Sequence, residues 1–402
     1  MAKRSDGEGS IYQTPDGWWH AAISRGKDPE TGRRLRSYVK AKTKQGVREK
    51  LNALLEDQRE GTFDRRNATV NEWLAVWLDM AEHSLKPASV AGYRTDAKRL
   101  ADMYGNVQLK KLTTEQIEVL YASLRRRGLS GTTVQGVHRS LRASLNEAVR
   151  RGWLAKNPVL HARPGRTEEH EIEPLSTGEA KAILEAAKGQ RNAARWAIAL
   201  SLGLRQGEAL GLCWNDVDLE AGTLQIKRTL QRVSWKHGCD PACGLPARQC
   251  PQRRDGGLVI LSPKSRSGRR TIAVPAPVLD ELRRHRRQQA EERLAAGELW
   301  RPGPNGGWVF AQANGKPVDP GRDWKSWKDL LKKAGVRDVR LHDARHSAAT
   351  YLLLQGVDAR TVMGMLGWSQ VSMTARYQHP VAELMQEAAQ RVGDLLWGEQ
   401  ER

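Results

Sequence analysis

The sequence predicts a mainly helical chain with small β-sheets, an α+β organisation in three parts. Residues up to about 60 alternate between apolar and polar side chains around turn residues, as short antiparallel strands do. The segment 69–157 changes to the spacing of amphipathic helices. From Ser176 onward, helices surround short strands, which indicates a mixed α/β domain. A chain of 402 residues has room for two or three domains.

The N-terminal part, residues 1–62, is predicted to be a three-stranded sheet followed by one helix. Turn signals rich in Pro, Asp and Gly separate the three apolar-alternating segments. Strands are expected at Ser10–Tyr12, Trp18–Arg25 and Leu35–Lys40. A helix is expected over Lys44–Gln58, because its apolar residues recur on one face.

The second part, residues 68–157, is predicted to be a compact bundle of four helices. Two of its helices begin with the spacing of a capping box. The pairs are Thr69 with Glu72, and Thr113 with Gln116. Two tryptophan pairs are interpreted as core residues rather than as platforms for stacked bases: Trp73 with Trp77, and Trp324 with Trp327.

The composition indicates a polyanionic partner. The formal net charge is +20 and the pI is near 10.1, and binding DNA phosphates is the simplest use of such an excess. No apolar stretch approaches the ~20 residues that span a bilayer, and the first ten residues lack the apolar core of a secretion signal. We therefore expect a cytoplasmic protein that works on nucleic acid and has no disulfide framework.

The third part, residues 172–397, carries five short motifs of polar residues. In chain order they are Gly203-Leu-Arg205-Gln-Gly-Glu208, Pro263-Lys264, Leu341-His342-Asp-Ala-Arg345-His346, Leu366-Gly367-Trp368 and Thr374-Ala-Arg-Tyr377. Taken singly, each of these residues is more often a surface charge, a cap or a core side chain. In this order and spacing, the chain resembles the catalytic domain of tyrosine recombinases, the family of lambda integrase and other phage and mobile-element integrases. The resemblance covers the whole chain as architecture, and its specific motifs lie within 202–379.

The resemblance implies a site-specific DNA recombinase or integrase that cuts and rejoins strands. Tyr377 would attack a phosphodiester and hold a 3′-phosphotyrosyl link, while a mobile element is integrated or excised. Arg205 and Arg345 would each offer a planar fork to the nonbridging oxygens, where charge builds in the transition state. Because the chain supplies these charges itself, we expect no cofactor to be required for catalysis.

Four further residues complete the expected site. His342 lies three residues before Arg345 on a predicted helix, hence on the same face, and its ordinary pKa of ~6.5 suits proton transfer. Lys264 corresponds to the lysine that, in the family, serves as the general acid and protonates the leaving 5′ oxygen. Glu208 would hold the Arg205 guanidinium or a neighbouring group. Many relatives have His where this chain has Trp368, and an indole donates one hydrogen bond but cannot shuttle a proton.

Two features remain open between two interpretations each. Arg269 and Arg270 are either phosphate contacts or charges at a strand edge. A loop holds four soft-ligand residues, either as a structural zinc site or as free thiols in a flexible basic loop. They are His237, Cys239, Cys243 and Cys250, whose spacing matches no standard zinc pattern.

The resemblance also implies a division of labour on double-stranded DNA. Residues 1–62 correspond to an arm-type DNA-binding domain, 68–157 to a helical core-binding (SAM-like) domain, and 172–397 to the catalytic domain. A final helix over Val381–Leu396 either docks on a neighbouring protomer, in a homotetramer on paired sites, or packs on its own domain. An excisionase and a DNA-bending host factor are further partners of the family. The alternatives are a topoisomerase IB-like relaxing enzyme, disfavoured by the arm-type module, and an inactive DNA-binding regulator, disfavoured by the intact residue set.

Overall fold

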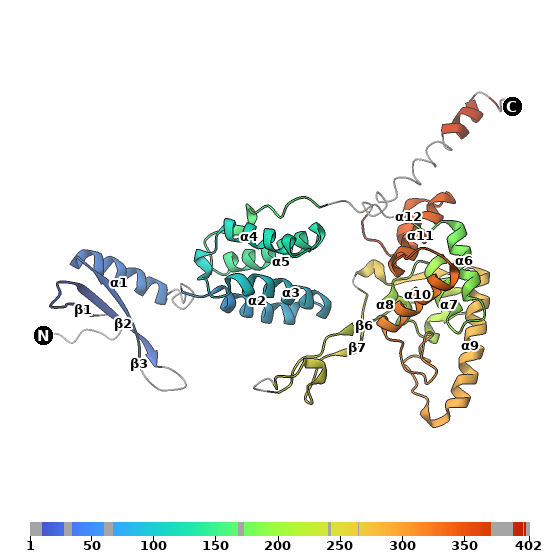
Figure 1. Cartoon of the computed structure of the whole chain (residues 1–402), viewed down its shortest axis with the longest axis horizontal. Coiled ribbons are helices and arrows are strands. Elements are labelled where there is room, and N and C mark those ends of the chain that lie inside the picture. Colours follow the sequence, from blue (N-terminus) through green and yellow to red (C-terminus); the bar gives the residue numbers. More distant parts are fainter. Residues whose placement is uncertain are drawn as a thin grey trace. The chain divides into compact units, whose positions relative to one another are not determined.

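The chain forms two compact units, residues 1–169 and 170–402 (Figure 1). The computed structural model describes residues 10–27, 34–59, 67–167, 173–239, 243–263, 265–370, 389–396 and 398. Helices predominate, and the sheets are small and antiparallel. The predicted fold class is therefore confirmed. Within these described ranges, no helix combines the length and apolar character needed to cross a membrane.

The first unit begins with an antiparallel sheet covered by one helix. Its strands are β1 (Ser10–Gln13), β2 (Trp19–Lys27) and β3 (Arg34–Ala41), and the helix is α1 (Lys44–Arg59). The register places Ile11, Ala21 and Val39 side by side. Alternation along each strand turns these residues to one face, which packs against Val47 and Leu51 of α1. The predicted N-terminal sheet and helix are confirmed.

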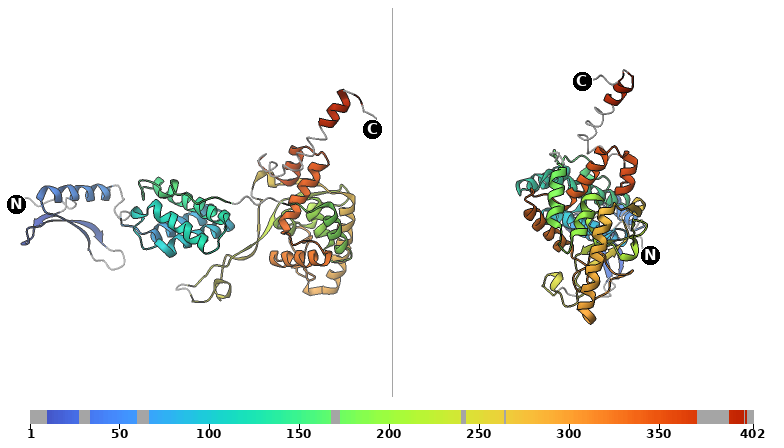
Figure 2. Two further views of the ribbon diagram at one scale, coloured as in Figure 1. Left: turned by 45° about the horizontal axis from the view of Figure 1, so that its top comes forward. Right: turned by 90° about the vertical axis from the view of Figure 1, so that its right-hand side faces the viewer.

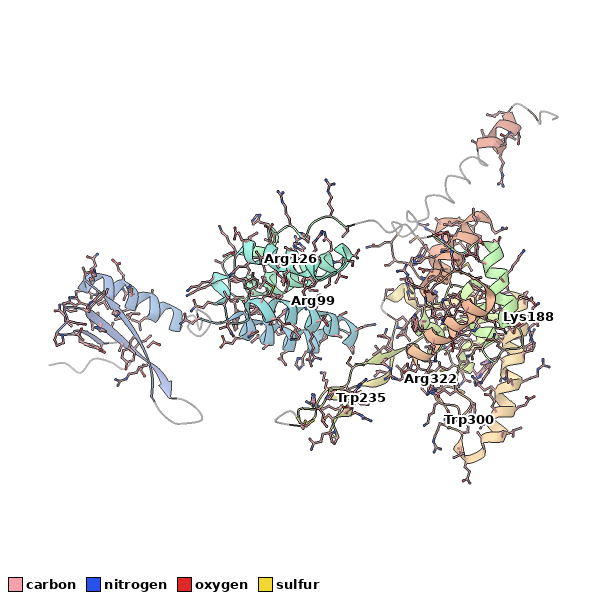
Figure 3. The ribbon with its side chains drawn as sticks, viewed as in Figure 1. Arg99, Arg126, Lys188, Trp235, Trp300 and Arg322 are labelled. Carbon is pink, nitrogen blue, oxygen red and sulfur yellow. The ribbon has the colours of Figure 1, made fainter. Side chains whose placement is uncertain are left out.

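A bundle of four helices follows in the first unit. They are α2 (Val70–Ser84), α3 (Pro87–Tyr104), α4 (Thr114–Arg126) and α5 (Gly131–Arg150). The side chains of Thr69 and Thr113 cap α2 and α4 as the sequence predicts. Trp73 is fully buried, and its indole N–H donates to Ser144 Oγ at 3.0 Å. Charged side chains such as Arg126 are left on the outside of the bundle (Figure 3).

The second unit combines helices with two small sheets (Figure 2). Its helices are α6 (Thr177–Ala187), α7 (Ala193–Ser201), α8 (Gln206–Leu210), α9 (Ala276–Ala296), α10 (Pro320–Ala334), α11 (Leu341–Leu354) and α12 (Ala359–Leu366). One sheet has the order β4-β5-β8, with strands β4 (Val217–Asp218), β5 (Thr223–Ile226) and β8 (Arg270–Ala273). The other is a hairpin of β6 (Thr229–Val233) and β7 (Gly257–Leu261). Of the expected final helix, residues 389–396 are helical and the rest lies outside the described residues.

The alternation of the sequence over Thr223–Val233 predicts one continuous strand, and that prediction is wrong. The chain there forms β5 and β6, which belong to different sheets. Lys227 and Arg228 separate them, and both pair with the buried carboxylate of Asp216. Because a buried carboxylate needs cationic or hydrogen-bonding partners, this ion pairing interrupts the strand that alternation alone suggests.

The core assignment holds for three of the four paired tryptophans and is wrong for Trp324. Trp73, Trp77 and Trp327 are buried, whereas Trp324 is 52% exposed. The buried stripe of α10 runs through Asp323, Trp327 and Leu330. Successive helical residues are about 100° apart, so Trp324 is turned off that stripe, and Lys328 lies over its ring.

A buried ion pair joins α7 to α10. Arg195 is 1% exposed and donates from Nε and Nη2 to the two carboxylate oxygens of Asp323, at 3.1 and 3.0 Å. The same carboxylate accepts from Gln206 Nε2 at 3.0 Å, which ties α8 to the pair. Two charges that are removed from water together depend strongly on each other, because either one left alone is an uncompensated buried charge.

We predict that Asp323→Ala lowers the free energy of unfolding of the second unit by about 3–5 kcal/mol, because Arg195 would be left buried without its carboxylate. Urea unfolding followed by tryptophan fluorescence measures the change. The double variant Arg195→Met with Asp323→Leu removes both charges, so its loss should be clearly smaller. Equal losses in the two variants would show that lost packing, rather than the stranded charge, sets the cost.

Candidate active site

Three arginines meet at the C-terminal end of α12. Three consecutive backbone carbonyls, those of residues 365–367, each accept a hydrogen bond from a different guanidinium. Arg270 Nε donates to Met365 O at 2.7 Å, Arg345 Nη2 to Leu366 O at 2.5 Å, and Arg205 Nη2 to Gly367 O at 3.3 Å. One helix end therefore gathers arginines from β8, α11 and the start of α8.

The helix end is suited to this task for two reasons. The last carbonyls of an α-helix have no partner within the helix, and they lie at the negative end of its dipole. Gly367 ends α12 with φ +65°, a left-handed conformation that glycine adopts without strain. A Cβ at this position would lie 2.9 Å from Arg270 Nη1 and from Ser267 O. The glycine is thus required both by the backbone and by the close approach of Arg270.

Glu208 ties two of the arginines together. Its carboxylate is 2% exposed and accepts from Arg205 Nη1 at 2.7 Å and from Arg270 Nη2 at 2.9 Å. It also accepts from the backbone N–H of Arg205 at 3.1 Å, so it caps α8. Burial alone would raise the pKa of Glu208, but the hydrogen bonds and charges of Arg270 and Arg205 hold it below its usual range. The group is ionised at neutral pH.

Arg345 is the most deeply buried of the three arginines, at 3% exposure. Besides Leu366 O, it donates to Gly203 O at 2.8 Å, and its guanidinium lies 5.8 Å from the ring centroid of Trp368. Gly203 has φ +60°, and a Cβ there would lie 2.8 Å from Leu366 Cδ2. The guanidinium is therefore fixed by two carbonyls and an aromatic face, partners that orient it and leave its charge in place.

Two histidines flank Arg345 on α11. The helix start is fixed by Asp343, which accepts from the backbone N–H of Arg340 at 2.9 Å. The rings of His342 and His346 meet edge to face at 4.9 Å. Partial desolvation, followed by the charges of Arg345 and Arg205, lowers the pKa of His342, so its imidazole is neutral at pH 7. Burial and the neighbouring His342 lower the pKa of His346 to about 4.

The structure brings together Arg205, Glu208, His342, Arg345 and Trp368 from the predicted set. Trp368 is 6% exposed and packs with the small core formed by α11 and α12. Lys264 and Tyr377 lie outside the described residues. Lys264 belongs to the connection from β7 to β8 in the sequence.

Arg270 is a site residue for which the sequence left two interpretations open. Although β8 is the outer strand of its sheet, the Arg270 side chain is not a solvent-exposed charge, since it is 6% exposed and pairs with Glu208. A signal was present in the strand alternation. Arg270 precedes the buried Ile272 by two residues and therefore faces the same side of β8. An arginine on the inward face of a strand needs a buried partner.

A second cluster lies in the segment that links β6 to β7. One ligand atom from each of His237, Cys239, Cys243 and Cys250 lies within 4.8 Å of all the others. Cys239 Sγ is 3.5 Å from Cys250 Sγ, and both Cys239 Sγ and Cys243 Sγ are 3.7 Å from His237 Nδ1. The four soft ligands that the sequence singled out do converge.

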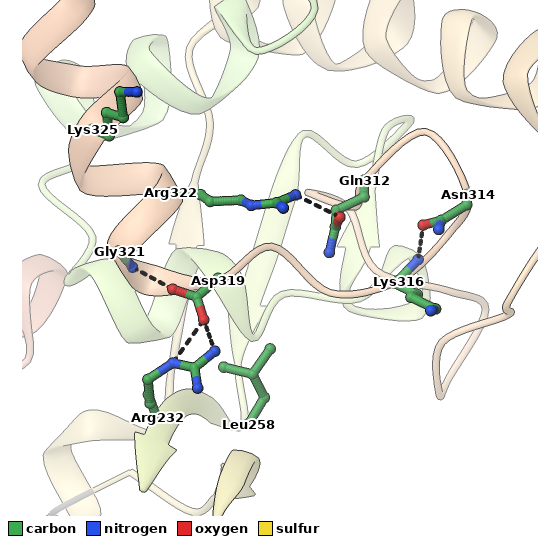
Figure 4. A pocket seen from close by; sticks show the side chains of 9 residues that line it. All are labelled: Arg232, Leu258, Gln312, Asn314, Lys316, Asp319, Gly321, Arg322 and Lys325. Carbon is green, nitrogen blue, oxygen red and sulfur yellow. Dashed lines mark hydrogen bonds and ion pairs between the residues drawn. The ribbon is translucent and has the colours of Figure 1, made fainter. Parts of the chain in front are cut away.

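An open hollow of about 560 Å³ lies at the base of the same hairpin (Figure 4). Arg232 of β6 crosses it to Asp319, with Nε 2.7 Å from Asp319 Oδ2. Arg322 donates to Gln312 Oε1 at 3.0 Å on its other side. The ion pair anchors the base of the hairpin to the start of α10, apart from the arginine cluster at α12.

The chain matches two family models, and it is similar over nearly its whole length to two known proteins of the same kind. The family model described as "Phage integrase family" matches residues 253–395, and the one described as "Phage integrase SAM-like domain" matches 69–163. The chain is 37% identical to an integrase of Saccharopolyspora erythraea, over 98% of both chains. It is 31% identical to a XerC-like tyrosine recombinase of Caldanaerobacter subterraneus, over 94% of this chain and 96% of that one.

Solved structures share the fold at low sequence identity. The Tn1549 transposon integrase in complex with a circular intermediate DNA matches with a TM-score of 0.62 at 20% identity, over 80% of this chain and 99% of that chain. A lambda integrase tetramer bound to a Holliday junction matches with a TM-score of 0.53 at 15% identity, over 93% and 96%.

We predict that acid destabilises the second unit by about 3 kcal/mol between pH ~6.5 and ~4, because His346 must stay neutral when folded but takes up a proton when unfolded. The folded pKa lies below the unfolded one, so this stability is complete above pH ~6.5 and is lost as the pH falls toward 4. Urea unfolding of His346→Gln at both ends of the window should show a smaller pH dependence. His161→Gln, at an exposed histidine of the first unit, is the control and should follow the wild type.

Proposed function

Because the chain belongs to the phage integrase family of tyrosine-type site-specific DNA recombinases, we propose that its second unit cuts and rejoins one DNA strand at a time through Tyr377. The observation that carries the proposal is the meeting of Arg205, Arg345 and Arg270 at the end of α12. Among the described residues, the carboxylate of Glu208 is shared by Arg205 and Arg270, so positive charge is in excess at this end of α12. A phosphate undergoing substitution is the group that needs such an excess.

Arg205 and Arg345 would contact the scissile phosphate. Arg205 is the more accessible, with 40% of its side chain exposed, so it can present remaining N–H groups to a nonbridging oxygen. Arg345 is held by backbone carbonyls, and its charge acts from inside the site through a medium of low polarity. Arg270 touches Glu208 and a carbonyl, so we assign it a positioning role.

The reaction balances without an external reactant. The Tyr377 oxygen forms a bond to phosphorus as the bond from phosphorus to the 5′ oxygen breaks. The phenolic proton passes to the neutral imidazole of His342, and the departing 5′ oxygen takes a proton from Lys264. Rejoining runs the same steps in reverse, with the phosphotyrosyl link conserving the bond energy. A tyrosine with an ordinary pKa of ~10 needs this base and positive field to react at pH 7.

Trp368 would position the guanidinium of Arg345 rather than transfer a proton. Its indole can donate one hydrogen bond but has no site that both accepts and releases a proton at neutral pH. Its ring lies against the guanidinium of Arg345. Packing in the α11 and α12 core keeps that ring in place.

We propose that the three parts of the chain divide the work on DNA. Residues 1–62 would bind arm-type sites, 68–157 core-type sites, and 172–397 would carry the chemistry, each supported by the resemblance described above. Lambda integrase forms a tetramer on a Holliday junction, which supports a homotetramer on paired sites for this chain. An excisionase, a DNA-bending host factor and action at the bacterial nucleoid belong to the same proposal.

We predict that a nicked suicide duplex traps a covalent protein–DNA adduct with the wild type and none with Tyr377→Phe, because the phenol oxygen is the group that bonds to phosphorus. Denaturing gel electrophoresis detects the adduct, and it should persist in the presence of a chelator. An adduct of undiminished yield in Tyr377→Phe would assign the nucleophile elsewhere.

Arg345→Ala supplies the matched variant for the same assay. Loss of a donor placed for the transition state costs about 10²–10³-fold in rate. The variant should therefore bind the duplex as the wild type does but form adduct at least about 100-fold more slowly. Loss of binding with an unchanged rate for the bound fraction would contradict the catalytic assignment.

The proposed chemistry calls for no cofactor, and the zinc that we propose is structural. A tetrahedral ion with bonds of ~2.3 Å to sulfur and ~2.05 Å to nitrogen separates its ligand atoms by about 3.6–3.8 Å. Three of the six separations among the ligand atoms of His237, Cys239, Cys243 and Cys250 are 3.5–3.7 Å, and all six lie within 4.8 Å. The four soft ligands would thereby cross-link the segment between β6 and β7.

We predict about one tightly bound zinc per purified chain, since the four ligands fill a tetrahedral shell. Elemental analysis after exhaustive dialysis measures it. Cys250→Ser should lose the metal. Cys213→Ala is the control, because Cys213 is buried in the core away from this cluster, and it should keep the metal. A metal-free wild type would remove the zinc assignment and leave the Tyr377 chemistry untouched.

A further inference from the structure

The β6–β7 hairpin extends away from the rest of the second unit (Figure 1, Figure 2). The tip, defined here as residues 234–256, has Cys250 as its one buried residue among those that the structure describes. Trp235, labelled in Figure 3, is half-buried against Gly256 and Gly257. A segment with so little apolar burial needs another source of order, and the cluster of His237 and three cysteines supplies it.

The tip displays three exposed arginines, Arg248, Arg253 and Arg254, and the last two donate to carbonyls of the tip's own backbone. Arg253 Nη1 donates to Arg248 O at 2.8 Å, and its guanidinium lies 5.0 Å from the ring centroid of Trp235. Arg254 Nε donates to His237 O at 3.4 Å. Within the described ranges of the chain, no carboxylate forms an ion pair with these three arginines. The one described acidic residue of the tip is Asp255, which is exposed.

These features fit a DNA backbone better than a protein surface. Arginine forks match phosphate oxygens in geometry and charge, and phosphates of a duplex recur along its surface at short, regular spacing. The family activity already brings a duplex to this unit. The base of the hairpin is anchored through Arg232 to Asp319, so the tip projects from a fixed root (Figure 4).

We propose that the tip of the β6–β7 hairpin is a zinc-ordered DNA-backbone contact, in which Arg248, Arg253 and Arg254 bind phosphates of the duplex outside the scissile site. The inference rests on the recombinase function and on the zinc site proposed above. It assigns to the tip a share of the affinity for DNA and none of the sequence specificity or chemistry.

The test is the salt dependence of binding to a duplex of random sequence, measured by fluorescence anisotropy with the full chain. Three phosphate contacts contribute about 2.7 to the slope of log affinity against log salt. The variant with Arg248, Arg253 and Arg254 all changed to Gln should therefore show a slope shallower by about 2.7. Between ~50 and ~200 mM salt, the wild type should lose about 40-fold more affinity than this variant.

The control variant removes the same charge from α9, on the other side of the unit from the hairpin (Figure 1). It carries Gln at Arg284, Arg287 and Arg293, which are exposed, and its slope should stay close to that of the wild type. A tip variant that keeps the wild-type slope overturns the proposal. A tip variant that binds random duplex normally but fails to assemble on paired sites would assign the surface to a protein partner instead.

Two further measurements separate this proposal from those it rests on. Cys250→Ser should lose zinc and also show a shallower slope, because the arginines lose their frame; an unchanged slope would overturn the role of the metal in ordering them. At low salt, the tip variant should still form the Tyr377 adduct on a nicked duplex at the wild-type rate. Loss of that adduct would place the tip in the chemistry and contradict a backbone contact.

Discussion

The second unit depends on one physical requirement: several guanidiniums must be held side by side without cancelling their charge. The end of α12 meets it with three neutral carbonyls, those of residues 365–367, at the negative end of a helix dipole. A separate carboxylate for each arginine would hold its guanidinium more tightly. It would also cancel most of the positive electrostatic field that could act on a phosphate. Glu208 is instead shared between Arg205 and Arg270. These hydrogen bonds hold the guanidiniums in place, and the cluster remains positive because most of the acceptors are uncharged carbonyls.

The same hydrogen bonds complete the fold. Arg205 lies 162 residues from Gly367 in the sequence, and Arg345 lies 142 residues from Gly203. The site therefore forms only when α8, β8, α11 and α12 have come together. Gly203 and Gly367 allow the closest approaches, since a Cβ at either would lie under 3 Å from a neighbouring atom. Donors placed by folding in this way need no rearrangement when charge develops on a phosphate, which is the condition for effective electrostatic stabilisation.

The sequence predicted what depends on local spacing. The capping boxes at Thr69 and Thr113 form as the pattern requires, and the spacing of His342 and Arg345 places both on α11. It could not decide what depends on long-range partners. For Arg270 it left a phosphate contact and a strand-edge charge open, because the deciding partner, Glu208, lies 62 residues away in the sequence. The split between β5 and β6 follows from Asp216, a residue before either strand. The sequence spacing of Trp324 and Trp327 does not show which of the two is buried. Only the elements that pack against α10 decide that Trp327 is buried and Trp324 is exposed.

The hairpin tip shows how a ligand set of irregular spacing becomes a compact one. The pairing of Lys236 with Arg254 sets the register of the two segments, and this brings His237 and Cys239 opposite Cys250. Gly238 permits the approach, because a Cβ there would lie 2.1 Å from Gln252 O. The irregular spacing thus reflects a cluster built across two segments of a hairpin. His237 contributes its ring to the cluster and its carbonyl to Arg254, so a zinc ion held there, as proposed, would also fix the position of the arginine.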